Sequence, residues 1–483
     1  MSTVLRSGRL KQSRKDVADF ISSFESDRRI AEASVLVNEA HLVALYRAGV
    51  IAKADSVKLV RALRAVKPGA QTRRSLEDIH VLIEEEVTRR AGEALGGMLH
   101  TGKSRNDQVA TAIRMALRDS ILALSNRLLS FERVLLRMSA NHTETLFVGY
   151  THLQPAQPIT FAHYLLAIGD AFLRDVGRLG ESYRRVNLCP MGAGALAGSS
   201  FLLDRGLVAR LLGFDGIVEN SLDAVGTRDF VLEALAMFGL VALDFSRLTQ
   251  DLIFYGSGDV GLLDWPDTFA STSSIMPQKK NPDVFELVRA RCGRVASNFS
   301  TAAGIVHALP SGYNLDFQEL TPMLWDSLDT LNSCLDMLVA VMGKVAPTKN
   351  IESRQSLRFI TATEVANTLA REANVPFREA HHLVGRAVRL ALERGKSFTE
   401  IAPADWEGLL GRRVDAATGR RLSEAARVGG SYTRYRTLGS PNPKETRRLI
   451  RKRLGEVELW ATRNQRAQAK VVAGLSSLRK ALN

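Results

Sequence analysis

The chain has 483 residues, of which 45% are hydrophobic and 24% charged, a composition that excludes a disordered, a collagen-like or a disulfide-stapled protein and predicts more than one domain. Its formal net charge of +14 lies at the two ends, because residues 411–483 hold 18 Lys and Arg against 5 Asp and Glu, and the first 15 residues hold 5 basic and no acidic side chains. The body between them is close to neutral, which argues against the nucleic-acid and anionic-membrane partners that an evenly basic protein would suggest.

Short helices are expected first, over residues 16–100, where glycine and proline interrupt the apolar pattern. The strongest helical signal follows, over residues 103–148, a stretch without glycine or proline. Between Val109 and Met138 apolar residues recur in steps of three and four, which predicts one helix on the order of 45 Å long. A helix of that length needs partners of similar length to cover its apolar face.

Three later stretches have the same helical pattern, at residues 227–255, 283–303 and 322–345. The tripeptide 281–283, Asn-Pro-Asp, is typical of a helix start. No run of alternating β-branched residues lies between these stretches, which argues against a parallel sheet. The middle of the chain is therefore predicted to be a bundle of very long helices, and after about residue 355 shorter helices return.

The three cysteines, Cys189, Cys292 and Cys334, lie far apart and form no CxxC pair, so neither a zinc site nor a disulfide framework is expected. Reduced core cysteines are typical of a cytosolic protein. The basic start of the chain is not followed by an apolar stretch, as a secretory signal would require, and no apolar run approaches the roughly 20 residues of a membrane span. We expect a cytoplasmic protein without a membrane partner.

Polar segments interrupt the helical pattern at four places. The first, residues 100–107, contains Ser104, Arg105 and Asn106 immediately before the longest predicted helix, where hydroxyl, amide and cationic groups can bind an anion. Ser104 or Asn106 could equally serve only as a helix cap. The second segment, residues 149–155, contains His152 between Thr151 and Leu153. This histidine could act as a general acid or base. The commoner alternative is a histidine that only forms hydrogen bonds within its loop.

The third segment, residues 270–282, has four hydroxyl residues followed by two lysines and an asparagine. Ammonium groups and helix N–H groups can stabilise an alkoxide and a developing carbanion, whereas the alternative is a flexible Ser/Thr-rich loop with a capping asparagine. The fourth segment, residues 310–319, has Tyr313 and Gln318, which could orient a substrate or belong to an ordinary loop. The glycine-rich stretch 191–199 lacks the GxGxxG pattern of a dinucleotide site.

The third segment, SSIMPQKKNPD at 273–283, resembles the signature of the fumarase/aspartase superfamily, and its QKKNPD part resembles the argininosuccinate lyase and delta-crystallin branch. Further motifs of that branch occur in the same order along the chain, so the resemblance covers nearly all of it. They are EDIH (77–80), HTGKSRNDQVAT (100–111), GYTHLQPAQP (149–158), GAGALAGSSFLLDR (192–205), NSLDAVGTRDF (220–230) and PSGYN (310–314).

The resemblance implies a mainly α, three-domain fumarase/aspartase-like fold, with an N-terminal helical domain over 1–106, a central long-helix bundle for tetramerisation over 107–355, and a small C-terminal helical domain with a basic tail over 356–483. It implies a homotetramer whose active sites are each built from three subunits, so that the four polar segments meet only between chains. The implied reaction is reversible β-elimination of the small molecule argininosuccinate to L-arginine and fumarate, without a metal or organic cofactor.

The resemblance also implies the role of each motif residue. Ser273 would be the base on a mobile loop, Lys279 and Asn281 would stabilise the carbanion and the serine alkoxide, and His152, polarised by Glu286, would be the proton donor. The preference for Ser273 over Ser274 comes from motif alignment alone. Substrate-binding residues would be Ser23, Asp78, His80, Ser104, Arg105, Asn106, Thr151, Tyr313 and Gln318.

Three positions depart from the family pattern. Thr272 replaces a glycine in the serine loop, and Leu315 and Thr321 stand where basic residues are common. Loss of a cation beside a substrate carboxylate weakens its binding. An alternative substrate is therefore a different N-substituted aspartate, cleaved by a related carbon–nitrogen lyase. The basic C-terminal region suggests a third, less favoured alternative, a non-catalytic structural or nucleic-acid-binding homologue.

Overall fold

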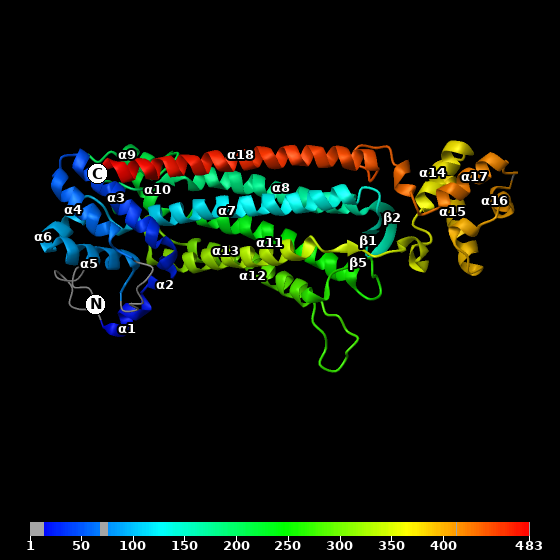
Figure 1. Cartoon of the computed structure of the whole chain (residues 1–483), viewed down its shortest axis with the longest axis horizontal. Helices are drawn as coiled ribbons and strands as arrows, with labels where there is room; N and C mark the ends of the chain where they lie inside the picture. The colour runs from blue at the N-terminus through cyan, green and yellow to red at the C-terminus, as the bar shows by residue number, and fades with distance from the viewer. Residues whose placement is uncertain (1–13, 68–75, 412, 483) are drawn as a thin grey trace.

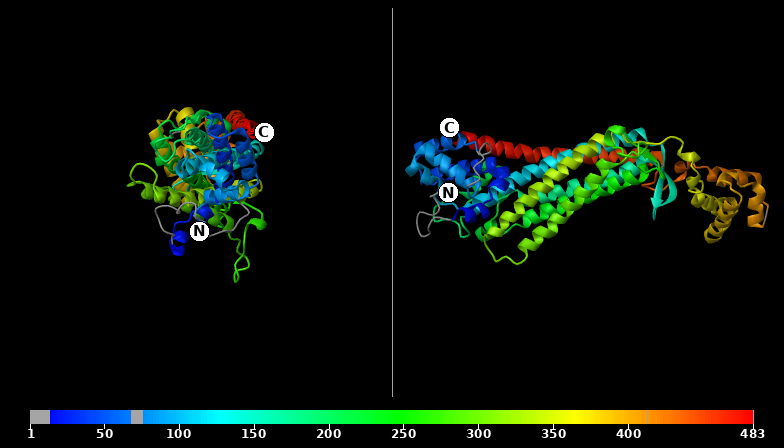
Figure 2. Two further views of the ribbon diagram at one scale, coloured as in Figure 1. Left: turned by 90° about the vertical axis from the view of Figure 1, so that its left-hand side faces the viewer. Right: turned by 90° about the horizontal axis from the view of Figure 1, so that it is seen from below.

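The computed structural model describes residues 14–67, 76–411 and 413–482. Long helices run side by side along an elongated molecule, with a group of shorter helices at each end (Figures 1 and 2). The basic N-terminal stretch noted in the sequence lies outside the described residues, except for Arg14 and Lys15. None of the described helices is long and apolar enough to cross a membrane.

The central bundle confirms the predicted long helices. The four that the apolar pattern predicts are α7 (Arg105–Asn141), α11 (Asp229–Gly256), α12 (Asp283–Val306) and α13 (Leu320–Met342). The sequence analysis did not single out two more, α8 (Phe161–Val186) and α18 (Pro443–Ala481). The sequence predicted α7 to be the longest helix. This prediction was wrong, because α18 has 39 residues and α7 has 37.

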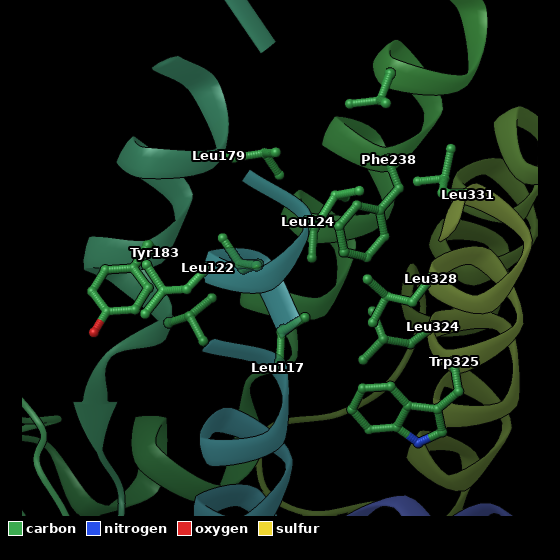
Figure 3. Close-up of a cluster of buried hydrophobic side chains, with 14 of the residues drawn as sticks. Leu117, Leu122, Leu124, Leu179, Tyr183, Phe238, Leu324, Trp325, Leu328 and Leu331 are labelled. Carbon is green, nitrogen blue, oxygen red and sulfur yellow. The ribbon is translucent and has the colours of Figure 1, made fainter. Parts of the chain in front are cut away.

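Interlocking apolar side chains hold the bundle together. Leu124 of α7, Phe238 of α11 and Leu328 of α13 point toward one another between the helices, and Leu179 of α8 lies on the other side of α7 (Figure 3). All four side chains are fully buried. Because such packing is dense and water-free, it makes the long helices a rigid support for the loops at their ends.

The N-terminal group covers one end of the bundle. It contains α1 (Lys15–Phe20), α2 (Phe24–Asp27), α3 (Ala31–Arg47), α4 (Lys53–Arg64), α5 (Ile79–Ala91) and α6 (Glu93–Gly97). The short helices α9 (Arg205–Leu211) and α10 (Ser221–Gly226), and the two-residue parallel pair of β3 (Leu188–Cys189) with β4 (Gly216–Ile217), lie at the same end (Figure 1).

The C-terminal group has a separate apolar core, formed by residues such as Leu369, Leu383 and Trp406. Its helices are α14 (Ala362–Glu372), α15 (Phe377–Glu393), α16 (Pro403–Leu410) and α17 (Ala416–Ala426). The range 356–483 does not stay together as predicted, because α18 leaves this group and returns along α7 and α8 (Figure 1). The buried Val457 of α18 belongs to the core of the bundle, and Arg453 pairs with Asp170 of α8.

A β-hairpin follows α7, where the sequence analysis placed only a short loop. Strand β1 (Leu146–Thr151) pairs with the antiparallel β2 (Gln154–Thr160). Its two turn residues, His152 and Leu153, have φ values of 54° and 57°, the left-handed region that suits a tight two-residue hairpin turn. The proline-rich second strand hid this hairpin, because proline is uncommon within strands. A second small pairing joins β5 (Leu263–Asp264) to β6 (Ala346–Pro347).

Candidate active site

A cavity of about 350 Å³ lies at the end of the bundle that carries the N-terminal helices. Its walls come from α2, the start of α5, the start of α7 and the loop before α13. Of the nine predicted substrate-binding residues, eight line it: Ser23, Asp78, His80, Ser104, Arg105, Asn106, Tyr313 and Gln318. The first and fourth polar segments therefore meet within a single chain, which corrects the expectation that all four segments meet only between chains.

The start of α7 shows that the two interpretations of Ser104 are compatible. Its side-chain oxygen accepts a hydrogen bond of 3.3 Å from the backbone N–H of Asn106, and its own N–H donates to Asp107 at 3.0 Å, which together form a capping box. The same residue lines the cavity. Capping thus holds Ser104 and Asn106 in place at a helix N-terminus, where anions are favoured.

Two of the three carboxylates that line the cavity, those of Asp27 and Asp78, are buried. Burial raises the pKa of Asp27 to about 7, although Ser23 donates it a hydrogen bond of 2.7 Å. Burial alone would also raise the pKa of Asp78, but the ion pair with Arg105 and the nearby His80 hold it below its ordinary value. Sequence reasoning missed Asp27, although its position one helical turn after Ser23 could have indicated it.

Of the two histidines that line the cavity, His80 and His100, the first is not a proton donor at neutral pH. Burial lowers the pKa of His80 to about 3, and neither ring nitrogen has a hydrogen-bond partner among the described residues. A neutral imidazole can still donate one hydrogen bond and accept one. The side chain of His80 is therefore suited to holding a bound molecule by hydrogen bonds and unsuited to acid catalysis.

Sequence reasoning also missed Arg228, which is 2% exposed and lines the cavity. Its guanidinium group donates to the backbone oxygens of Val225 at 3.2 Å and Thr227 at 2.7 Å, and lies over the rings of Tyr313 and Phe317. Its Nε has no partner among the described residues, and burial lowers its pKa to about 10. The signal was present in the motif NSLDAVGTRDF, where a lone cation precedes a long apolar helix.

The two departures from the family pattern also line this cavity. Leu315 and Thr321 contribute an apolar group and a hydroxyl group, and the hydroxyl of Thr321 donates to the backbone oxygen of Gln318 at 3.0 Å. Among the residues lining the cavity, the arginine side chains are those of Arg105 and Arg228. Both arginines have an Nε without a partner among the described residues, but Arg105 is paired with Asp78, so Arg228 is the better candidate for holding a substrate carboxylate.

The serine loop projects from the bundle just before α12 (Figure 1). Its base is closed by paired backbone hydrogen bonds between Ser271 and Asn281, at 2.8 and 3.4 Å. Within the loop, Oγ of Ser273 accepts hydrogen bonds from the backbone N–H groups of Ile275 at 3.3 Å and Met276 at 3.2 Å. Hydrogen-bond donors in this position can stabilise negative charge on that oxygen.

The two neighbouring lysines of the loop differ in their contacts. Lys280 binds Asp264 at 3.0 Å, Asp267 at 3.0 Å and the backbone oxygen of Trp265, and thereby anchors the loop. The exposed side chain of Lys279 makes no hydrogen bond or ion pair with the described residues of its own chain. Glu286, in the first turn of α12, is likewise exposed. The loop thus presents Lys279 to its surroundings and uses Lys280 for structure.

The predicted proton donor stands far from the cavity. His152 and Thr151 are exposed at the tip of the hairpin, which follows the last residue of α7, whereas Arg105 at the first residue of α7 lines the cavity. A helix of 37 residues separates these two ends by about 55 Å. None of the predicted catalytic residues lines the cavity of the same chain, and Thr151 is the one predicted substrate-binding residue that does not.

Comparisons with known proteins find relatives over most of the chain. The pattern of the lyase family matches residues 9–297, and that of the argininosuccinate lyase C-terminal family matches residues 359–423. The chain is 39% identical to the argininosuccinate lyase of Methanocaldococcus jannaschii over 93% of each protein, and 38% identical to that of Methanococcus aeolicus over 94% of each. No group of three or more His, Cys, Asp or Glu side chains in the described part of the chain is placed to hold a metal ion.

Solved structures resemble the chain over its whole fold. A crystal structure of EDDS lyase in complex with formate superposes with a TM-score of 0.87 at 27% identity, covering 94% of this chain and 91% of the other. A fumarate lyase from Mesorhizobium sp. BNC1 superposes with a TM-score of 0.72 at 20% identity, covering 91% of this chain and 99% of the other. The second likeness bears on the fold alone, and both confirm the predicted mainly α fold of the fumarase/aspartase kind.

Proposed function

Because the chain belongs to the argininosuccinate lyase family of carbon–nitrogen lyases, we propose that it cleaves argininosuccinate reversibly to L-arginine and fumarate, as a cytoplasmic enzyme of arginine biosynthesis. The observation that carries this function is the convergence of distant family motifs in one cavity. The same cavity of about 350 Å³ is lined by residues from motifs that lie more than 200 positions apart in the sequence: EDIH, HTGKSRNDQVAT and PSGYN.

Proton abstraction is assigned to Ser273. The elimination requires a base that removes a proton from the carbon next to a carboxylate, and a hydroxyl is a weak base unless its alkoxide is stabilised. The two backbone N–H groups that donate to Ser273 supply part of that stabilisation. Lys279 and Asn281 supply an ammonium group and an amide donor for the carboxylate as it becomes dianionic.

Protonation of the leaving guanidine is assigned to His152, with Glu286 as the carboxylate that polarises it. The side chain of His152 is exposed at the hairpin tip, and a histidine side chain can donate a proton in general acid catalysis. Both residues would act on a substrate held by another chain.

A homotetramer whose active sites draw on three subunits reconciles these positions. The cavity and the hairpin lie at opposite ends of α7, about 55 Å apart, so one chain cannot hold a single small substrate between them. Antiparallel neighbours would bring the hairpin and the serine loop of two other chains to the cavity. Substrate contacts would then come from the eight predicted residues of the cavity and from Thr151 of a neighbour. We propose no metal and no organic cofactor.

Release of fumarate tests this function directly. Purified protein mixed with argininosuccinate should show the rising ultraviolet absorbance of fumarate, and the reverse reaction should consume fumarate when arginine is added. Size-exclusion chromatography with light scattering on the same sample should give four chains. A folded tetramer that releases no fumarate from argininosuccinate would contradict the assignment.

A second candidate is a lyase that releases fumarate from a different N-substituted aspartate. Leu315 and Thr321 favour it, because they remove cations from the wall of the cavity. The solved structures that resemble this chain include an EDDS lyase variant with bound fumarate. Turnover on a panel of N-substituted aspartates separates the two candidates: the highest kcat/KM for argininosuccinate supports the first, and a higher value for another adduct supports the second.

A further inference from the structure

A second, larger hollow of about 860 Å³ lies where the small C-terminal helices join the bundle. The segment 432–442 and the first turns of α18 form its walls. In Figure 1 this end of α18 lies near the hairpin of β1 and β2, at the end of the bundle opposite the candidate active site. None of the residues that line the hollow lines the active-site cavity. Its basic wall residues are Arg436, Lys444, Arg447, Arg448 and Arg451.

The positive charge of the hollow is only partly neutralised. Arg447 pairs with Glu144, and Arg448 binds Glu445 through Nε at 2.9 Å. The other three cations, at positions 436, 444 and 451, form no ion pair with the described residues. Like charges that share one hollow repel one another, and an anion placed between them removes that repulsion. The N-terminus of α18, where the positive end of the helix dipole lies, adds to the positive potential of the hollow.

A buried hydroxyl group gives independent evidence that the hollow receives a ligand. Ser440 lines the hollow and is 7% exposed, yet its Oγ is buried without a hydrogen-bond partner among the described residues. Buried hydroxyl groups nearly always have a partner, because leaving one unpaired costs free energy. An acceptor oxygen in the hollow would provide the partner that the chain itself does not.

The hollow also touches the base of the hairpin. Glu144, two residues before β1, is the partner of Arg447, and its backbone oxygen accepts a hydrogen bond from the hydroxyl of Tyr432. The hollow is therefore next to the segment that leads into the hairpin, although it is separate from the cavity that holds the motif residues.

We propose that this hollow is a binding site for a small oligophosphate anion, held by Arg436, Lys444 and Arg451 and hydrogen-bonded by Ser440. Arginine side chains present paired N–H groups that match phosphate oxygens. Two or more linked phosphates satisfy three cations at once, which a single carboxylate or sulfate does not. The volume, more than twice that of the active-site cavity, accommodates such a group. The site accounts for part of the basic C-terminal region, which the proposed catalysis leaves unused.

Calorimetric titration of the full-length protein with sodium tripolyphosphate, at a constant ionic strength of about 0.15 M, tests this site. We expect saturable binding that is weakened at least about tenfold in a double variant, Arg436→Glu with Arg451→Glu. The matched control carries Arg466→Glu with Lys480→Glu, which makes the same charge change at exposed positions of α18 outside the hollow. This control should bind as tightly as the unchanged protein, and citrate should bind the unchanged protein more weakly than tripolyphosphate.

Two further measurements keep the test decisive if the double variant folds poorly. Ser440→Ala should weaken tripolyphosphate binding several-fold without lowering thermal stability, because it removes a hydroxyl that has no partner in the chain. Saturating fumarate should not displace tripolyphosphate, since the hollow and the active site share no residues. The proposal is overturned by equal losses in the test and control variants, by displacement with fumarate, or by single-stranded DNA that binds the hollow more tightly than tripolyphosphate.

Discussion

The backbone N–H of Met276 donates a hydrogen bond of 3.2 Å to the side-chain oxygen of Ser273. The N–H of Ile275 donates to the same atom, whereas the hydroxyl of Ser274 receives no such bond from the described residues. In the sequence, only motif alignment distinguishes these two adjacent serines. In the structure they differ in the hydrogen bonds that their hydroxyl oxygens accept. Ser273 is the one whose alkoxide the loop can stabilise.

Replacing each of these serines in turn tests that difference. Ser273→Ala should lower kcat by several orders of magnitude because the base is lost, and Ser274→Ala should lower it by less than about tenfold. Fumarate release followed by ultraviolet absorbance gives both values, and light scattering verifies an unchanged assembly. Near-normal turnover by Ser273→Ala would assign the base to another residue.

The hairpin tip offers a conservative test of the acid. His152→Asn should lower kcat about 10²–10⁴-fold, because asparagine tolerates a φ of 54° but cannot donate a proton to the leaving group. Leu153→Asn, at the neighbouring left-handed and exposed position, serves as the matched control and should retain most activity. Equal losses in both variants would mean that the shape of the turn, and not the imidazole, is required.

The two lysines of the serine loop should respond differently to removal of their charge. Lys279→Met should abolish most turnover, because its ammonium group is free to stabilise the dianionic carboxylate. Lys280→Met should change kcat far less and should instead loosen the loop, because Lys280 pairs with Asp264 and Asp267. Steady-state kinetics with limited proteolysis of the loop measures both effects. A larger kcat loss in Lys280→Met than in Lys279→Met would reverse the assignment.

Arg228 is expected to bind a substrate carboxylate. Arg228→Gln should raise KM about tenfold or more, because a charge-assisted hydrogen bond contributes on the order of 1.5–3 kcal/mol. Arg114→Gln is the matched control: Arg114 is also buried, donates to the backbone oxygen of Arg185 at 2.8 Å and lies over the ring of Phe230, but does not line the cavity. It should lower stability without raising KM.

A second-site change sharpens the same prediction. Thr321 and Phe317 both line the cavity, and Arg228 lies over the ring of Phe317. The family that the sequence resembles often has a cation at position 321. Adding Thr321→Lys to the Arg228→Gln variant should recover part of the lost affinity for argininosuccinate. A KM that stays raised in the double variant, with unchanged folding, would mean that Arg228 acts by positioning Tyr313 and not through its charge.

The buried Glu132 predicts a pH-dependent stability. Burial, with a smaller contribution from Asp170, raises its pKa to about 8, and neither of its oxygens has a partner among the described residues. The unfolded chain releases this proton near pH 4.5, so the folded state binds more protons between that value and about 8, and the free energy of unfolding falls as the pH rises through this range.

Glu132→Gln should remove that dependence. The variant should be nearly as stable as the unchanged protein at about pH 5, and more stable at about pH 8.5, by on the order of 1–3 kcal/mol. Thermal unfolding at both pH values measures the difference, with the exposed Glu219→Gln as a control that should show no pH-dependent gain. A stability difference that does not grow with pH would contradict a buried, protonated Glu132.

The long helices could be predicted because an apolar stripe with helical period specifies a packed helix whatever its neighbours are. The stripe of α7 is of this kind, whereas α18 is basic and its buried residues, such as Val457 and Val471, are widely spaced. Its packing depends on partners in α7 and α8, including the ion pair of Arg453 with Asp170, that no local pattern reveals. The hairpin was missed for a similar reason, because pairing with β1 overrides the low strand propensity of the prolines in β2.

By itself the sequence determined the bundle, the four polar segments and the family, because periodicity and motif order are properties of the chain alone. The distribution of charged residues along the sequence showed that the two ends are basic, but it did not show what those basic residues do. Only the tertiary structure decided that Asp27 and Arg228 share a cavity with Ser104, and that His152 stands about 55 Å away along α7. It also decided that three cations without an ion pair among the described residues line the same hollow as Ser440. Contacts between distant segments decide which side chains are buried, which form ion pairs and how far apart they lie. These contacts therefore set the charge state of each side chain and the groups that it can contact.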